Sequence, residues 1–132
     1  MKKLILITFF AAILFYSCEK ESIPETFEIG IVEEFHHGEM NQSIDNSLKF
    51  SITKIEDSRC ASDVTCVWEG KTDITIVVES PQSGSIVLST FDNLIDTVGN
   101  FSFEIIEVSP YPISTQTIEL EDYNVNLKIE KL

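Results

Sequence analysis

Apolar and polar residues alternate in short runs along most of the chain. Phe27, Ile29 and Ile31 form the first of these runs. Further alternating runs cover residues 48–52, 74–78, 86–88, 101–105 and 123–129. A period of two in segments rich in β-branched and aromatic residues is the pattern of β-strands, because successive side chains of a strand point to opposite faces. The pattern therefore predicts six or seven short strands.

The breaks between these runs indicate how the strands connect. The sequence from Pro81 to Gly84 predicts a turn, and therefore a hairpin between the strands on either side of it. The run 74–78 is apolar at almost every position, which predicts a central strand. No helical period occurs outside the signal peptide described below. We therefore expect an all-β domain, an antiparallel β-sandwich, with a small closed barrel as the alternative.

Long segments separate some of the predicted strands. Residues 34–47, 56–70, 91–100 and 109–122 are longer than ordinary hairpin connections. Long loops on a rigid β scaffold are the usual place for binding residues. We therefore expect any binding site to lie in these loops.

The N-terminus has a different pattern. Two lysines precede an apolar run over residues 4–16, and Ser17 and Cys18 follow it. This is the layout of a secretory signal peptide, and the run is too short to span a bilayer comfortably, since that takes about 20 residues. A cysteine directly after the small residue resembles a bacterial lipoprotein signal, in which Cys18 is acylated. Ordinary cleavage that leaves Cys18 as a free thiol is the alternative.

The chain therefore divides into three parts. Residues 1–17 are expected to be a signal peptide with a helical apolar core, and residues 18–26 a lipidated cysteine with a polar tether. Residues 27–132 are expected to form the β-sandwich domain. This organisation places the protein in the cell envelope, anchored by lipid to the outer membrane, on its periplasmic or its cell-surface face.

Charge narrows the range of partners. Without residues 1–17 the chain has 7 basic and 22 acidic residues, a formal net charge of −15. Such a surface repels nucleic acid phosphates and anionic lipid headgroups, so neither is an expected partner. Membrane contact is expected through the N-terminal lipid alone, and a protein of the cell envelope is the expected partner.

Residues 57–70, with the sequence DSRCASDVTCVWEG, contain two cysteines. In an exported protein Cys60 and Cys66 are expected to form a disulfide, and lipidation of Cys18 leaves this pair even. A metal site would need two more soft or imidazole ligands. The disulfide is therefore the preferred interpretation.

This segment resembles the signature of a family of short exported bacterial proteins, many of them lipoproteins, which has no assigned activity. Its pattern is Asp-Ser-Arg-Cys-Pro followed by Val-x-Cys-x-Trp-x-Gly, and the residues in register are Asp57, Ser58, Arg59, Cys60, Val64, Cys66, Trp68 and Gly70. Ala61 stands where the family has proline. The later segment EVSPYPIS and the strand beginning at Tyr123 are similar to the family's C-terminal half, so the resemblance covers residues 45–132. It implies export and this architecture, and it adds no catalytic residue.

Asp57, Arg59 and Trp68 are the candidate binding surface, because exposed Trp and Arg are typical binding anchors. The structural interpretation is that Trp68 packs over the disulfide in the core while Arg59 fixes the loop. We expect this structural role for both residues rather than a binding role.

His36 and His37 are weak candidates for zinc or copper ligands, since three carboxylates accompany them. Neighbouring histidines in a strand would point to opposite faces, which favours a solvated acidic turn. The sequence contains no Gly-x-Ser-x-Gly or similar motif that would supply a serine nucleophile for either histidine to activate. We therefore expect no cofactor, no catalytic residue and no enzyme, but a non-catalytic binding or accessory module. The alternatives are an inhibitor-like protein that presents the 57–70 loop to a partner enzyme, and a metal-binding lipoprotein.

Overall fold

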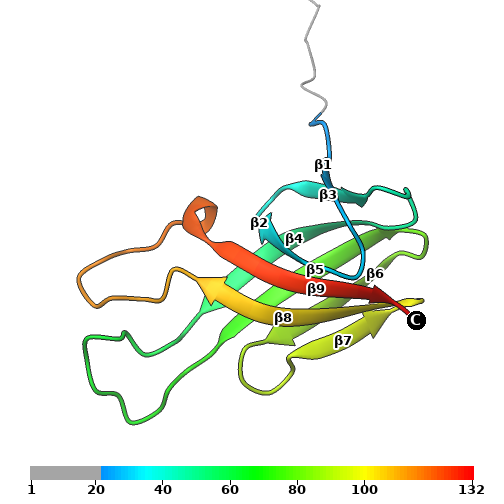
Figure 1. The fold of residues 1–132 in the computed structure, drawn as a ribbon. Coiled ribbons are helices and arrows are strands. Elements are labelled where there is room, and N and C mark those ends of the chain that lie inside the picture. The colour runs from blue at the N-terminus through cyan, green and yellow to red at the C-terminus, as the bar shows by residue number, and fades with distance from the viewer. Residues whose placement is uncertain (1–21) are drawn as a thin grey trace, which may run out of the picture.

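The computed structural model describes residues 22–132, which form two β-sheets packed face to face (Figure 1). The signal peptide at 1–17 and the lipidation site Cys18 lie outside the described residues. Nine strands and one short 3₁₀ helix, η2 (Leu120–Asp122), are present in residues 22–132. The strands are β1 (Glu25–Phe27), β2 (Val32–His36), β3 (Met40–Ser43), β4 (Lys49–Asp57), β5 (Thr72–Ser80), β6 (Gly84–Ser89), β7 (Ile95–Val98), β8 (Phe101–Ser109) and β9 (Asn124–Lys131). None of residues 22–132 belongs to a helix long and apolar enough to cross a bilayer.

The two sheets have the orders β1-β3-β4-β5-β6 and β2-β9-β8-β7. All neighbouring strands are antiparallel except β1 and β3, which are parallel. The predicted all-β sandwich is confirmed, and the sheets do not close into a barrel. The predicted hairpin is also confirmed, because β5 and β6 pair on either side of Pro81–Gly84. As expected for a central strand, β5 lies between β4 and β6.

The core consists of the inward-facing apolar residues of both sheets. Phe27, Phe35, Phe50 and Phe103 pack edge to face, with ring centroids 5.1 to 5.4 Å apart. The alternating residues of the predicted strands supply most of the remaining core, including Ile74, Ile76, Val125, Leu127 and Ile129. Burial of these side chains is the main term that holds the two sheets together.

The prediction of one strand over residues 27–31 is wrong. Phe27 ends β1 in the five-stranded sheet, and the chain turns at Gly30, whose φ is +98°. It then enters β2 in the four-stranded sheet at Val32. Because β1 begins at Glu25, the sheet also starts two residues before the expected domain boundary.

Nine strands are present where six or seven were expected, because β2, β3 and β7 lie in or extend into segments expected to be loops. In β3 the inward residues are polar: Asn41 and Ser43 are buried and replace the expected apolar positions. The Ser43 hydroxyl donates to the Asp45 carboxylate (2.6 Å) and accepts from the Leu48 amide (3.0 Å). Polar side chains satisfied by hydrogen bonds can occupy a core-facing position, and they hide the strand from a hydrophobic pattern.

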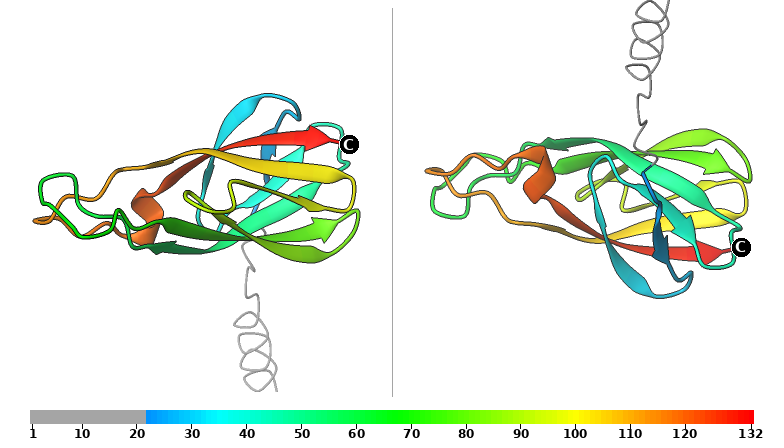
Figure 2. Two further views of the ribbon diagram at one scale, coloured as in Figure 1. Left: turned by 90° about the horizontal axis from the view of Figure 1, so that it is seen from below. Right: turned by 90° about the horizontal axis from the view of Figure 1, so that it is seen from above.

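Two long loops project together from one end of the sandwich, and both views in Figure 2 show them side by side. One loop, residues 58–71, joins β4 to β5, and the other, residues 110–119, follows β8. We call these two segments the arm. The C-terminus lies at the opposite end of the sandwich (Figure 1).

Candidate functional site: an arm of two paired loops

The first loop of the arm is closed at its base by hydrogen bonds to main-chain carbonyl oxygens. The amide and the hydroxyl of Ser58 both donate to the Lys71 carbonyl oxygen, at 2.8 and 2.9 Å. The Cys60 amide donates to the Glu69 carbonyl oxygen at 2.7 Å. Gly70 has a φ of +72°, and a Cβ there would lie 1.9 Å from the Ser58 carbonyl oxygen. Only glycine therefore allows the two sides of the loop to approach this closely.

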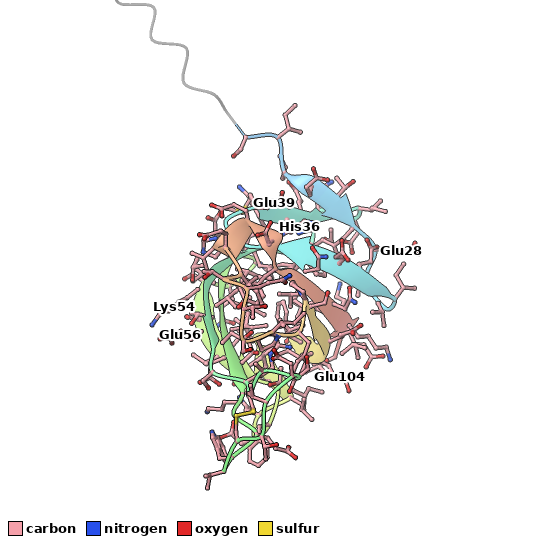
Figure 3. The ribbon with its side chains drawn as sticks, turned by 90° about the vertical axis from the view of Figure 1, so that its left-hand side faces the viewer. Glu28, His36, Glu39, Lys54, Glu56 and Glu104 are labelled. Atoms are coloured by element: carbon pink, nitrogen blue, oxygen red, sulfur yellow. A yellow bond between two sulfur atoms is a disulfide. The ribbon has the colours of Figure 1, made fainter. Side chains whose placement is uncertain are left out.

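The predicted disulfide is confirmed. Cys60 and Cys66 are bonded, with their Cα atoms 6.0 Å apart, and the bond appears in yellow in Figure 3. It closes a small ring beyond the hydrogen-bonded base. The disulfide limits the shapes available to the outer part of the loop, which contains Val64.

The second loop of the arm is hydrogen-bonded to the first. The Asp63 carboxylate accepts from the Ser114 amide at 2.8 Å and from the Ser114 hydroxyl at 2.6 Å. The Ser62 amide donates to the Pro112 carbonyl oxygen at 2.9 Å. The hydrogen bonds from Ser114 hold the pKa of Asp63 below its usual value. The two loops are therefore one structural unit.

A buried ion pair joins the arm to the sandwich. Arg59 donates from Nε to Asp57 Oδ1 at 2.8 Å and from Nη2 to Asp57 Oδ2 at 2.6 Å. The side chains are only 8% and 7% exposed. The Thr72 hydroxyl (3.0 Å) and the Tyr123 hydroxyl (3.0 Å) also donate to the Asp57 carboxylate. We call Asp57, Arg59, Thr72 and Tyr123 the clasp; its residues lie on β4, on the loop after it, on β5 and immediately before β9.

Arg59 also reaches the second sheet. Its Nη1 donates to the Val108 carbonyl oxygen at 2.7 Å, and its Nη2 donates to the Pro110 carbonyl oxygen at 2.9 Å. Its guanidinium lies over the Tyr111 ring, 4.7 Å from the centroid, in cation–π geometry. The clasp therefore fixes both loops of the arm to the two sheets at once.

The contacts within the clasp shift the pKa values of Asp57 and Tyr123. Burial alone would raise the pKa of Asp57, but the hydrogen bonds and positive charge of Arg59 hold it below the usual 3.8. Burial, followed by the negative charge of Asp57, raises the pKa of Tyr123 to about 12. The aspartate is therefore ionised and the tyrosine neutral at neutral pH, which is the state in which both hydrogen bonds form.

The three candidate surface residues have different positions. Asp57 and Arg59 are buried, and their contacts fix the loop as the structural interpretation proposed. The expectation that Trp68 packs over the disulfide in the core is wrong, because Trp68 is 56% exposed. Its ring contacts Phe91 edge to face, with centroids 5.3 Å apart. Asp57 and Arg59 therefore support the arm, whereas Trp68 is presented by it.

Trp68 is one of several large apolar side chains exposed on or beside the arm. The set comprises Val64, Val67, Trp68, Phe91, Leu94, Ile106, Tyr111 and Ile113. A groove of about 340 Å³ runs between the arm and β8. Phe91, Leu94, Ile106 and Tyr111 line it, together with the carboxylate residues Glu69 and Glu107.

Sequence reasoning missed these groove residues, although one of them left a signal. Ile105 and Ile106 are consecutive apolar residues in a strand that otherwise alternates, and the register of β8 against β9 shifts between Ile105 and Glu107. Ile106 is the extra residue of this β-bulge, so its side chain is exposed beside the groove. Phe91 was a single apolar residue in a polar segment, and nothing in the pattern placed it next to Trp68.

The two histidines contact different sheets. His36 Nδ1 lies 3.4 Å from the Tyr123 carbonyl oxygen, whereas His37 Nε2 lies 3.2 Å from the Thr53 carbonyl oxygen. Within residues 22–132, no three His, Cys, Asp or Glu side chains form a group suited to a metal ion. His36 also lies well away from the disulfide in Figure 3. Each imidazole therefore has a main-chain contact of its own.

Comparisons with family models, with curated proteins and with solved structures find no match. The family resemblance of the 57–70 motif therefore stays an expectation. The structure does give most of the motif a physical role. Ser58, Cys60 and Gly70 shape the first loop, and Asp57 and Arg59 belong to the clasp.

Proposed function

We propose that the protein is a lipid-anchored, non-catalytic binding module of the cell envelope, and that the arm contacts a protein partner. The observation that carries this proposal is the exposure of Trp68 on a loop that a disulfide, a neighbouring loop and a buried ion pair all brace. Exposed clusters of large apolar side chains typically mark interaction sites, and Trp and Tyr are the commonest binding anchors.

The disulfide and hydrogen bonds that order the arm support the proposal that it binds a partner. A loop that is already ordered loses little conformational entropy when a partner covers it, so more of the contact energy appears as affinity. The disulfide and the Asp63–Ser114 hydrogen bonds supply this order beyond the edge of the sandwich. The apolar residues Val67 and Trp68 lie on this ordered segment.

The lipid anchor is the part of the proposal that rests on sequence alone. Ser17 and Cys18 follow the apolar run, and an acidic domain needs a covalent lipid to remain at a membrane surface. Intact-mass spectrometry of the protein extracted from native membranes tests this. We expect the mass of residues 18–132 plus acyl chains, less two hydrogens for the disulfide. An unlipidated mass would contradict the anchor.

One observation favours the inhibitor-like alternative. Val67 is fully exposed next to Cys66, so the first loop presents an apolar residue directly beside its disulfide. Such a braced loop is suited to entering the cleft of an enzyme. If the partner is an enzyme, its turnover should slow on addition of the wild-type domain but not of the Cys60→Ser, Cys66→Ser variant.

Site-resolved photocrosslinking in the native host tests the binding proposal. A benzophenone amino acid replaces Trp68 in one strain and Ile44 in a control strain. Ile44 is 67% exposed, and it lies in the turn between β3 and β4, at the other end of the sandwich from the arm (Figure 1). We expect a discrete crosslinked protein from position 68 that is absent from position 44. Equal products at both positions, or none at position 68, would overturn the proposal.

A further inference from the structure

The groove beside the arm borders an open edge of β8. On one side β8 pairs with β9 as far as Ser109. On the other side its pairing with β7 ends at Glu104, followed by a single hydrogen bond from the Ile105 amide to the Leu94 carbonyl oxygen (2.8 Å). Among the strands of residues 22–132, none pairs with residues 106–109 on this side. An open edge of this kind can accept an extended segment of another chain.

Arg59 covers only part of this edge. Its guanidinium donates to the carbonyl oxygens of Val108 and Pro110, where a neighbouring strand would otherwise donate. The same guanidinium is already paired with Asp57, so its positive charge is neutralised within the protein. Arg59 therefore forms the base of the groove and does not supply a free cation for an acidic ligand.

The lining of the groove is apolar at its centre. Phe91, Leu94, Ile106 and Tyr111 are each about half exposed, and the Trp68 ring contacts the Phe91 ring edge to face. A volume of about 340 Å³ lies at the small end of the range for binding pockets. The groove is therefore suited to one or two apolar side chains of a peptide rather than to a large cofactor.

The charge around the groove is negative. Glu69 and Glu107 line it, and neither is in any of the ion pairs formed within residues 22–132. The whole chain has a formal net charge of −13, so a second copy of this protein would be repelled. A basic partner would be attracted to the same surface and steered towards it.

We infer that the groove binds an extended segment of the partner protein in which an apolar residue is flanked by lysine or arginine. The segment lies along the open edge of β8, its apolar side chain contacts Phe91 and Ile106, and its basic side chains face Glu69 and Glu107. This inference rests on the proposed function and specifies the chemistry of the partner's contact segment.

Selection from a random heptapeptide library on the folded domain tests the inference. We expect the enriched peptides to carry an aromatic or aliphatic residue with lysine or arginine on at least one side. The selection is repeated on a Glu69→Gln, Glu107→Gln variant, which we expect to lose the basic preference. Enrichment of acidic or uncharged peptides, or no enrichment at all, would overturn the inference.

Fluorescence of Trp68, the only tryptophan in the chain, then measures the binding of one enriched peptide. We expect saturable binding that weakens about fivefold in the Glu69→Gln, Glu107→Gln variant and weakens further in high salt. The matched control is Glu25→Gln, Glu28→Gln, which removes the same charge; Glu28 lies well away from the arm in Figure 3. Equal losses in both variants would show a non-specific charge effect and overturn the inference.

Failure of the proposed function and failure of the inferred segment chemistry give different results in the crosslinking and peptide-selection experiments. Crosslinking at position 68 without a basic–apolar peptide preference would preserve the proposed function and remove only the inferred segment chemistry. Absence of crosslinking at position 68 would remove the proposed function itself. Dimerisation of the chain through Ile106 and Phe91, detected by sedimentation of the wild type and of a Phe91→Ala variant, would also overturn the inference.

Discussion

Replacing Arg59 with alanine should destabilise the domain far more than the loss of an ordinary surface ion pair. The change leaves the Asp57 carboxylate without its cation in a site where its side chain is only 7% exposed. It also removes the donors to the Val108 and Pro110 carbonyl oxygens. Breaking a buried ion pair by removing one partner costs about 3–5 kcal/mol, because the remaining charge is left uncompensated.

The measurement is chemical and thermal unfolding at neutral pH. For a domain of this size a loss of 3–5 kcal/mol corresponds to a fall in Tm of roughly 12–20 °C. The matched control is Lys54→Ala, which breaks the pair between Lys54 and Glu56, whose side chains are 59% and 61% exposed. We expect the control to lose less than about 1 kcal/mol. A loss below about 1 kcal/mol for Arg59→Ala would refute the reasoning.

The same variant should change how stability depends on pH. In the folded protein the pKa of Asp57 lies below its unfolded value, so its contribution is fully present above about pH 4 and is lost as the pH falls through the folded pKa. Without Arg59 the main cause of this lowering disappears, while burial continues to raise the pKa. We therefore expect the gap between wild type and Arg59→Ala to be larger at pH 7 than at about pH 2.5. An equal gap at both pH values would contradict this account of the clasp.

Three further predictions concern the loop base, the disulfide and the tyrosine. The Cys60→Ser, Cys66→Ser variant should lose about 2–3 kcal/mol in denaturant unfolding, since the bond closes a short ring; no loss would contradict a bracing role. Gly70→Ala should lose more than about 2 kcal/mol in the same assay, because its φ is +72° and the added Cβ would overlap a carbonyl oxygen. Tyr123 should ionise near pH 12 in an ultraviolet titration, and Asp57→Asn should lower this pKa, while burial of the ring still holds it above the usual 10. A Tyr123 titration near 10 in the wild type would show that the tyrosine is outside the clasp.

The core of the fold could be predicted because its residues follow the strand period. Val125, Leu127 and Ile129 alternate with polar residues and are all buried in β9. The strands that were not predicted are those in which buried positions are not simply the apolar ones. In β3 the buried residues are Asn41 and Ser43, which hydrogen bonds stabilise in the core.

The candidate site could be predicted only in part. The spacing of Cys60 and Cys66 was sufficient for the disulfide, because the chemistry of an exported cysteine pair is local. The burial of Arg59 and the exposure of Trp68 depend instead on β8 and on the segment near Phe91, which lie far away in sequence. A local motif does not report such contacts. The sequence therefore located the loop and the fixing role of Arg59 correctly, but it wrongly placed Trp68 in the core.

The central claim is that a rigid arm presents Trp68 at the surface. The fluorescence of Trp68, the only tryptophan in the chain, tests this claim most directly. It requires no partner, and it reports both the exposure of the side chain and the rigidity of the arm. We expect red-shifted emission that iodide quenches readily, with an anisotropy that decays at the tumbling rate of the whole domain. Blue-shifted emission protected from iodide would place Trp68 in the core. Rapid loss of anisotropy would show a flexible loop, and either result would contradict a rigid arm that presents Trp68 to a partner.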